Sequence, residues 1–246
     1  VADQIWDKMV AFANYGFPES HSVSFAHLVY ASSWIKYHYP AAFCAALLNS
    51  QPMGFYSPHS LAQDARRHGV KVLTPDLNAS ADQAILESCD KSIDGVAVRL
   101  GFSSVRGIGA DLAFEIAAAG PYKDLEQLSR RTNASRKQLE ALATSGAFGC
   151  FGFTRREALW AVGAVAQSRS DRLRGIVTGA SAPPLPGMSL REEAVSDLWA
   201  TGIAPDGHPT RFVREVLKRR GVVTASDLSN CEFRKVKVAG VVTHRQ

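Results

Sequence analysis

The stretch that decides the fold covers residues 100–116 and reads L-G-F-S-S-V-R-G-I-G-A-D-L-A-F-E-I. Apolar residues recur at helical spacing on both sides of Gly107-Ile108-Gly109, so the stretch is predicted to form a helix, a tight turn and a second helix. Glycine allows the turn to adopt φ > 0 and to approach a ligand closely. The N–H groups that open the second helix lack intrahelical acceptors and lie at the positive end of its dipole. The turn is therefore suited to binding a phosphate backbone.

The same stretch is also compatible with a plain helical hairpin, in which the glycines only permit the turn. A second hairpin follows, because residues 124–131 have a helical pattern and Ser135 can cap another helix that ends at Ser145-Gly146. Two hairpins in succession predict a compact paired unit, which a single glycine turn would not. The repeat therefore favours the phosphate-binding interpretation.

The distribution of charge agrees with that interpretation. The formal net charge is +5, and residues 1–99 hold 7 Lys and Arg against 9 Asp and Glu, whereas residues 100–246 hold 21 against 14. The basic excess begins at the hairpin, where a nucleic-acid interface is expected. The predicted DNA contacts come from the two hairpins, namely Arg106, Gly107, Ile108, Gly109, Arg136 and Lys137. A run of charge is also typical of a plain solvated surface.

The rest of the pattern predicts a mainly α protein with one small antiparallel β element. Further helices are expected over residues 3–16, over a segment that ends before Pro40, and over another that begins at Pro40. Four more are expected over residues 58–69, 154–165, 189–200 and 209–220. Strands are expected at residues 70–73, 85–86 and 96–100, with a charged turn over 90–95. A Pro- and Gly-rich linker over 175–187 and a final strand over 235–242 complete the prediction.

Composition excludes several classes of protein. No apolar run approaches the roughly 20 residues that span a bilayer, and no leader pattern opens the chain, so no membrane partner is expected. The 4 cysteines lie far apart without zinc-type spacing, which predicts neither disulfides nor a metal site and favours a reducing cytoplasm. The chain starts at Val1 and stops within a strand-like run, so we expect it to be cut from a longer polypeptide.

No set of acids, bases or nucleophiles in the sequence is typical of a catalytic site. Paired carboxylates for two metal ions, a nucleophile elbow and a Walker loop are all missing, so no catalytic or metal-binding residue is predicted. Ser20 and His21 lie at the start of the long helix, where the dipole favours an anion. Alternatively, Ser20 or Ser22 only caps this helix and His21 lies on the surface.

Two long segments resemble a known family. G-F-P-E-S-H-S-V-S-F-A-H-L-V-Y-A-S-S-W-I-K-Y-H-Y-P begins at Gly16, and Y-S-P-H-S-L-A-Q-D-A-R-R-H-G-V begins at Tyr56 and is followed by P-D-L-N-A-S. These segments resemble the C family of DNA polymerases, which includes the bacterial DNA polymerase III alpha subunit. The similarity is greatest to the error-prone, damage-inducible branch of that family, and it lies in the segments W-I-K, Q-P-M-G-F-Y and Q-D-A-R-R-H-G-V.

The resemblance implies a position within a much larger enzyme. Residues 1–52 correspond to the end of the fingers domain, 53–98 to an α/β connector, and 99–150 to a tandem helix-hairpin-helix unit that grips duplex DNA. Residues 151–234 correspond to helices and a linker, and 235–246 to the first strand of a truncated OB domain. The palm domain, which binds the catalytic Mg²⁺, would precede Val1, so no cofactor is expected in this chain.

The resemblance also implies roles for single residues. Ser20 and His21 match the fingers segment near the nucleotide pocket, and Lys36 matches a lysine usual in the following helix. Many relatives have a lysine where this chain has Glu19, which argues against a phosphate contact there. Gln167 is followed by Ser-Arg-Ser and not by the apolar residues of a sliding-clamp motif. Clamp access is therefore expected through a partner protein of the mutasome, which contains an inactive Y-family-like polymerase subunit.

The predicted function is that of a fragment of an error-prone DNA-directed DNA polymerase, a nucleotidyltransferase used in translesion synthesis and DNA repair during the SOS response. This part of the enzyme would bind the backbone of duplex DNA and complete the fingers. The alternative is a protein-interaction scaffold that docks mutasome partners and binds little DNA itself.

Overall fold

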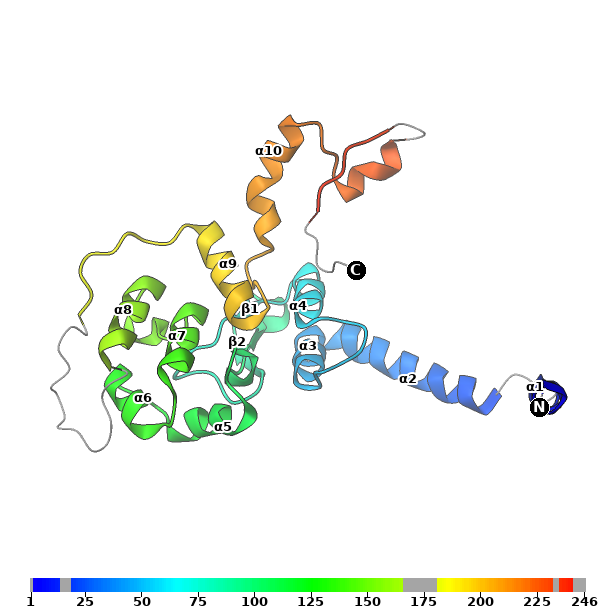
Figure 1. Ribbon diagram of the computed structural model, residues 1–246, viewed down its shortest axis with the longest axis horizontal. Helices are drawn as coiled ribbons and strands as arrows, with labels where there is room; N and C mark the ends of the chain where they lie inside the picture. Colours follow the sequence, from blue (N-terminus) through cyan, green and yellow to red (C-terminus); the bar gives the residue numbers. More distant parts are fainter. Residues whose placement is uncertain (1, 14–18, 166–180, 232–234, 241–246) are drawn as a thin grey trace.

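The computed structural model describes residues 2–13, 19–165, 181–231 and 235–240 (Figure 1). The chain is mainly helical, as the sequence predicts. The α-helices are α1 (Ala2–Ala13), α2 (Glu19–His38), α3 (Pro40–Asn49), α4 (Pro58–Arg67), α5 (Ala110–Ala119), α6 (Leu125–Arg131), α7 (Arg136–Ser145), α8 (Arg155–Val165), α9 (Leu190–Thr201) and α10 (Arg214–Arg219). The short 3-10 helices are η1 (Ile93–Gly95), η2 (Phe102–Ser104), η3 (Gly149–Phe151), η4 (Pro209–Val213) and η5 (Ala225–Asn230).

One small sheet lies between the N-terminal helices and the hairpins (Figure 1). Its strands are β1 (Val72–Leu73), β2 (Ile85–Ser88) and β3 (Val96–Arg99), in the order β1-β3-β2. The β2–β3 pair is antiparallel, but β1 runs parallel to β3, so the prediction of a purely antiparallel element is wrong for β1. The register gives the reason. Residues 74–84 join the end of β1 to the start of β2 at the same end of the sheet, since Leu73 and Ile85 both pair with Arg99. β2 therefore runs opposite to β1, and β3, which follows it in an antiparallel pair, runs parallel to β1.

The charged turn predicted over residues 90–95 is confirmed between β2 and β3. It contains two residues with positive φ, Asp94 at 55° and Gly95 at 67°. The strands it joins are held side by side by an ion pair in which Arg99 Nε lies 2.7 Å from Glu87 Oε2. The hydrogen bond from the Arg99 guanidinium is the main cause that lowers the pKa of Glu87.

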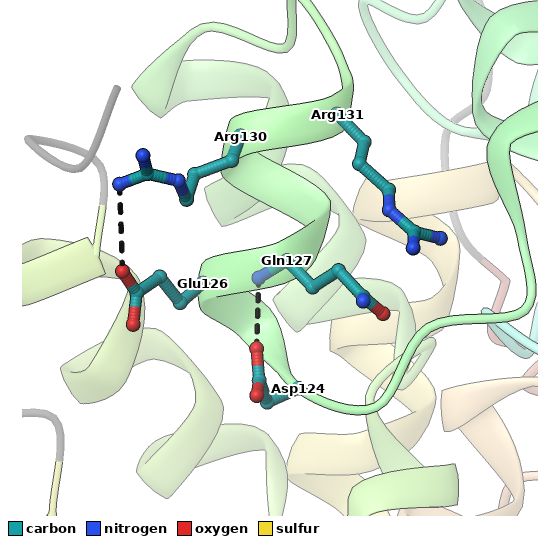
Figure 2. A pocket seen from close by; sticks show the side chains of 5 residues that line it. All are labelled: Asp124, Glu126, Gln127, Arg130 and Arg131. Atoms are coloured by element: carbon teal, nitrogen blue, oxygen red, sulfur yellow. Dashed lines mark hydrogen bonds and ion pairs between the residues drawn. The ribbon is translucent and has the colours of Figure 1, made fainter. Parts of the chain in front are cut away.

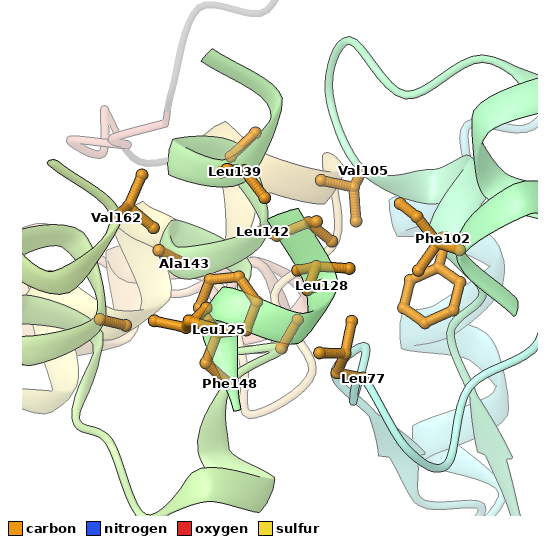
Figure 3. Packing of buried hydrophobic residues seen from close by; sticks show 14 of the residues in the cluster. Leu77, Phe102, Val105, Leu125, Leu128, Leu139, Leu142, Ala143, Phe148 and Val162 are labelled. Atoms are coloured by element: carbon orange, nitrogen blue, oxygen red, sulfur yellow. The ribbon is translucent and has the colours of Figure 1, made fainter. Parts of the chain in front are cut away.

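The two hairpins and α8 enclose the largest core cluster (Figure 3). The first hairpin differs from its prediction, because the single 3-10 turn η2 replaces a helix before the glycine turn. The second hairpin, α6 and α7, follows its prediction, with Asp124 as the N-cap of α6 and Gly146 in the left-handed conformation after α7. Fully or nearly fully buried side chains fill the space between them, including Phe102, Val105, Leu128, Leu142 and Phe148.

The N-terminal helices form an arm that extends away from this core (Figure 1). The apolar side chains of α2 are exposed along much of its length, with Leu28 61% and Tyr30 74% exposed. The aromatic side chains of Trp34, Tyr37 and Tyr39 are exposed as well. α3 is the first helix with buried residues, and it packs on α4 and β3.

The C-terminal part departs furthest from the predicted elements. The capping box Ser189–Glu192 opens α9 as expected, but the basic helix predicted over 209–220 is divided into η4 and α10. Within residues 235–240 the predicted strand is reduced to an isolated bridge between Lys237 and Val222. The rest of that strand and part of the linker over 175–187, like Gln167, lie outside the described residues. The part of the chain that is described contains no helix long and apolar enough to cross a bilayer.

Gly101 is required where the sheet leads into the first hairpin. A Cβ at this position would lie well inside 3.0 Å of the backbone of Gln83, so one of two main-chain segments would have to move. Gly101→Ala is therefore expected to lower the free energy of unfolding by about 3 kcal/mol, measured by urea denaturation.

Gly54→Ala is the matched control, because no atom lies within 4 Å of a Cβ built at Gly54. Its stability should equal that of the wild type within ~0.5 kcal/mol. Equal stabilities for the two variants would contradict the close approach at Gly101.

Candidate nucleic-acid interface

The first glycine turn is built by three residues with different tasks. Gly107 has φ of +76°, a conformation that residues with a Cβ rarely adopt. Ile108 is buried in the hairpin core, and its N–H donates to Val105 O at 3.0 Å. Gly109 is the N-cap of α5, with φ of −79° and ψ of 172°. Of the predicted DNA contacts, Ile108 thus lies in the core, whereas both glycines lie on the surface.

The first turn of α5 is open to a ligand. The first i→i−4 bond of the helix runs from Ala113 N–H to Gly109 O, so the N–H groups of residues 110–112 precede it. Gly109 has no side chain that could accept from them, and no protein atom lies within 4 Å of a Cβ built at Gly107 or Gly109. The first turn of α5 also contains one acidic residue, Asp111, and its carboxylate weakens the attraction of the turn for an anion.

The second hairpin turn is connected to the first by one side chain. Gln138 Oε1 accepts from Ser135 N–H and Ser135 Oγ, each at 2.8 Å, which closes the start of α7. The amide group of Gln138 also donates from Nε2 to Gly107 O at 2.9 Å. The N-termini of α5 and α7 are therefore held together at one surface. Gln138 was not among the residues predicted from the sequence, although a Ser followed three residues later by Gln is a recognisable capping box.

The predicted cations differ in their surroundings. Arg106 is exposed, and its guanidinium lies over the ring of Trp199, 5.0 Å from the centroid. Arg136 pairs with Glu140 on its own helix, with Nε 2.8 Å from Oε1. Lys137 is exposed and has no ion pair within the described parts of the chain. Arg106 and Lys137 are therefore the cations best placed to meet a phosphate.

A shallow pocket of about 240 Å³ on α6 does not extend this surface (Figure 2). Its lining combines acids with bases: Arg130 lies 3.6 Å from Glu126, and Asp124 accepts from Gln127 N–H at 2.7 Å. Arg131 donates from Nη1 to Ala119 O and Pro121 O. Arg131 thereby stabilises the loop between α5 and α6, and the two carboxylates of the lining balance its two guanidinium groups, so the pocket carries no net positive charge.

The residues predicted on the nucleotide side of the fingers do not lie together. Ser20 lies in the first turn of α2, and the ring of His21 contacts Phe25 with centroids 4.4 Å apart. Lys36 is near the other end of α2, about 22 Å further along the helix axis. Its Nζ lies 2.7 Å from Asp64 Oδ2 on α4. The structure therefore gives Lys36 an ion pair that joins α2 to α4.

Lys36 and Asp64 also line a pocket of about 570 Å³ with an apolar lining from Phe43 and Leu47. Cys44 lies in the same pocket, and burial raises the pKa of its thiol to about 12. The thiol is therefore protonated at neutral pH and is not a nucleophile. Across the described ranges, no group of three or more His, Cys, Asp or Glu side chains is arranged to hold a metal ion.

Comparison with known proteins agrees with the paired hairpins. Residues 69–158 match the helix-hairpin-helix motif. Over the full length of the chain, identity is 55% to the error-prone DNA polymerase of Mycolicibacterium paratuberculosis, 53% to that of Mycobacterium tuberculosis and 52% to that of Nocardia farcinica. Error-prone DNA polymerases are thus homologues of the whole chain. The chain spans 22% of the length of each of these error-prone DNA polymerases.

Helix α9 lies outside the matched motif but is attached to it by polar contacts, of which the Arg155–Asp197 pair is mostly buried and the Arg156–Glu192 pair is more exposed. Arg155 on α8 donates from Nη2 to Asp197 Oδ1 at 2.6 Å and from Nη1 to Glu193 O at 3.0 Å. Arg156 pairs with Glu192 at 2.9 Å. Asp197 is 4% exposed, and this burial raises the pKa of its carboxyl to about 6 against the opposing effect of Arg155.

The raised pKa of Asp197 predicts a pH dependence of stability. The folded state favours the protonated carboxyl, so its contribution to stability is complete below the ordinary pKa of 3.8 and is lost as pH rises through about 6. The free energy of unfolding of the wild type should therefore fall, relative to that of Asp197→Asn, between pH 4 and pH 7. Urea unfolding at several pH values measures this difference.

Glu215→Gln provides the control, because it removes a carboxylate from α10, which is neither part of the Arg155–Asp197 pair nor a cause of the raised pKa of Asp197. Its pH profile should be parallel to that of the wild type. A constant difference between the wild type and Asp197→Asn over this range would contradict the assignment.

Proposed function

We propose that the paired hairpins hold duplex DNA by its phosphate backbone within an error-prone DNA polymerase. The observation that carries the proposal is the hydrogen bond from Gln138 to Gly107 O, which holds two helix N-termini side by side. The N–H groups of residues 110–112 can donate hydrogen bonds to phosphate oxygens, and they lie at the positive end of the α5 dipole. Arg106 and Lys137 supply the flanking positive charge.

The expected binding is independent of DNA sequence. Backbone N–H groups, Arg106 and Lys137 recognise phosphate oxygens, which are the same at every base pair. Each cation that neutralises a phosphate releases counterions, so affinity should fall steeply as salt rises. Asp111 weakens the attraction at α5, which leaves the cations with a large share of the binding free energy.

The role of the parent enzyme is part of the same proposal. The names of the relatives and the identity over the whole chain support a DNA-directed DNA polymerase, in which this chain would complete the fingers and hold the duplex. Translesion synthesis in the SOS response, a cytoplasmic location and Mg²⁺ bound by a palm domain outside this chain belong to the proposal. So do mutasome partners, including an inactive Y-family-like subunit, and indirect access to the sliding clamp.

One observation favours a second function as an interaction scaffold. Large apolar side chains are exposed on α1 and α2, including Trp6, Met9, Phe25, Leu28 and Tyr30. Exposed apolar surface of this extent is typical of a protein–protein contact. Capture of a mutasome partner by the chain, together with a flat DNA titration, would favour the scaffold over the DNA-binding function.

Gly109→Ala tests the hairpin turn without disturbing the fold. The backbone at Gly109 is extended, and a Cβ there meets no protein atom within 4 Å, so only a bound ligand would be displaced. The variant should unfold at the wild-type temperature but bind a duplex about 5-fold more weakly, or ~1 kcal/mol, in a fluorescence anisotropy titration at low salt.

Gly163→Ala on α8 is the matched control, because its Cβ also meets nothing within 4 Å and it lies outside both hairpin turns. It should bind DNA like the wild type and gain about 0.5–1 kcal/mol of stability from the helical Ala. Wild-type affinity of Gly109→Ala at every salt concentration would contradict the proposed contact.

The salt dependence of binding should distinguish the two adjacent cations of α7. Lys137→Ala should reduce the slope of log K against log salt by about 0.9, the effect of one phosphate contact. Arg136→Ala should change the slope less, because Glu140 already neutralises this guanidinium. A larger effect of Arg136→Ala would show that the ion pair opens on binding and would overturn the assignment to Lys137.

A further inference from the structure

The contacts of Arg106 join the hairpin turn to α9. Its backbone N–H donates to Ala200 O at 2.7 Å, and its guanidinium lies 5.0 Å from the centroid of the Trp199 ring. The next residue, Gly107, accepts the hydrogen bond from Gln138. Hydrogen bonds to the backbone at Arg106 and at Gly107 therefore fix the main chain from which the Arg106 side chain extends. The indole ring restricts the guanidinium at the other end of that side chain.

The guanidinium of Arg106 keeps its hydrogen-bonding capacity. A guanidinium stacked on a ring uses its face, whereas its five N–H groups point outward in its plane. Within the described ranges, no carboxylate or carbonyl accepts from the Arg106 guanidinium. An exposed, oriented fork of donors matches the geometry of a phosphate, which accepts two parallel hydrogen bonds.

The helix that carries Trp199 is anchored on the rest of the protein. Asp197, two residues before Trp199, is the buried partner of Arg155, and Ala200, the next residue, is fully buried, so the backbone of α9 is anchored on both sides of Trp199. The indole is 47% exposed and therefore lies at the surface beside the hairpin turn. Stacking on a ring that extends from an anchored backbone reduces the side-chain entropy that Arg106 would lose on binding.

We propose that Trp199 is a positioning residue for DNA binding: its ring holds the Arg106 guanidinium for one phosphate of the duplex and makes α9 part of the interface. This inference rests on the proposed function of the hairpins. The adjacent open N-terminus of α5 and exposed Lys137 favour a phosphate backbone over a single carboxylate of an acidic protein. Arg106 is the contact, and Trp199 acts through it.

A double-mutant cycle in the full chain tests this coupling. Arg106→Ala should lower the slope of log K against log salt by about 0.9. Trp199→Leu keeps an apolar side chain without an aromatic ring, and should weaken duplex binding about 3-fold at low salt. The double variant should bind no more weakly than Arg106→Ala alone, because Trp199 acts only through Arg106.

Two further variants serve as controls. Trp199→Phe keeps an aromatic face and should retain most of the wild-type affinity. Trp160→Ala removes a tryptophan of similar exposure, 50%, from α8 and should leave DNA binding unchanged. Thermal unfolding verifies that each variant is folded.

Additive effects of Arg106→Ala and Trp199→Leu, or equal losses for Trp199→Leu and Trp160→Ala, would overturn the proposal. Wild-type affinity and slope for Arg106→Ala would overturn it as well, whatever the stability of the Trp199 variants. Failure of the proposed function is distinguishable, because in that case the wild-type chain would not bind the duplex at all. If the wild type binds DNA and the effects of Arg106→Ala and Trp199→Leu are additive, the role of Trp199 is contradicted and the proposed function of the hairpins is not.

Discussion

The geometry of the candidate interface depends on the contact of Gln138 with the first glycine turn. Its oxygen closes the start of α7 at Ser135, and its nitrogen donates to Gly107 O at 2.9 Å. A single amide group therefore sets the distance between two helix N-termini. Without that bond, Gly107 O would lose a protein partner and the two dipoles would be less firmly aligned. The hairpin core supplies the stability, and this bond supplies the geometry of the candidate interface.

Local patterns predicted most elements of this unit. Ser135, Asp124 and the box Ser189–Glu192 cap helices where their sequence places them. Helical periodicity did not predict η2, because three residues between Gly101 and Val105 allow one 3-10 turn and no more. It also did not predict that β1 is parallel to β3, since the direction of a two-residue strand depends on the long connection that follows it.

The sequence predicted which segment of the chain forms the candidate site, but not which distant residues lie beside it. The sequence predicted phosphate contacts at Gly107 and Gly109, and a Cβ built at either glycine would meet open space. It grouped Ile108 with the contacts, whereas periodicity alone cannot reveal that its side chain anchors the turn in the core. Trp199 and Gln138 lie far from the turn in sequence, so only the packing of α9 and α7 brings them to it.

The most direct test of this account is amide hydrogen exchange with and without duplex DNA. Bound phosphate should slow exchange at the backbone N–H groups of residues 110–112, which open α5, and at the start of α7. Exchange in the exposed helix α2 should remain unchanged. Unaltered exchange at both helix N-termini when DNA is bound, with protection elsewhere, would contradict the account.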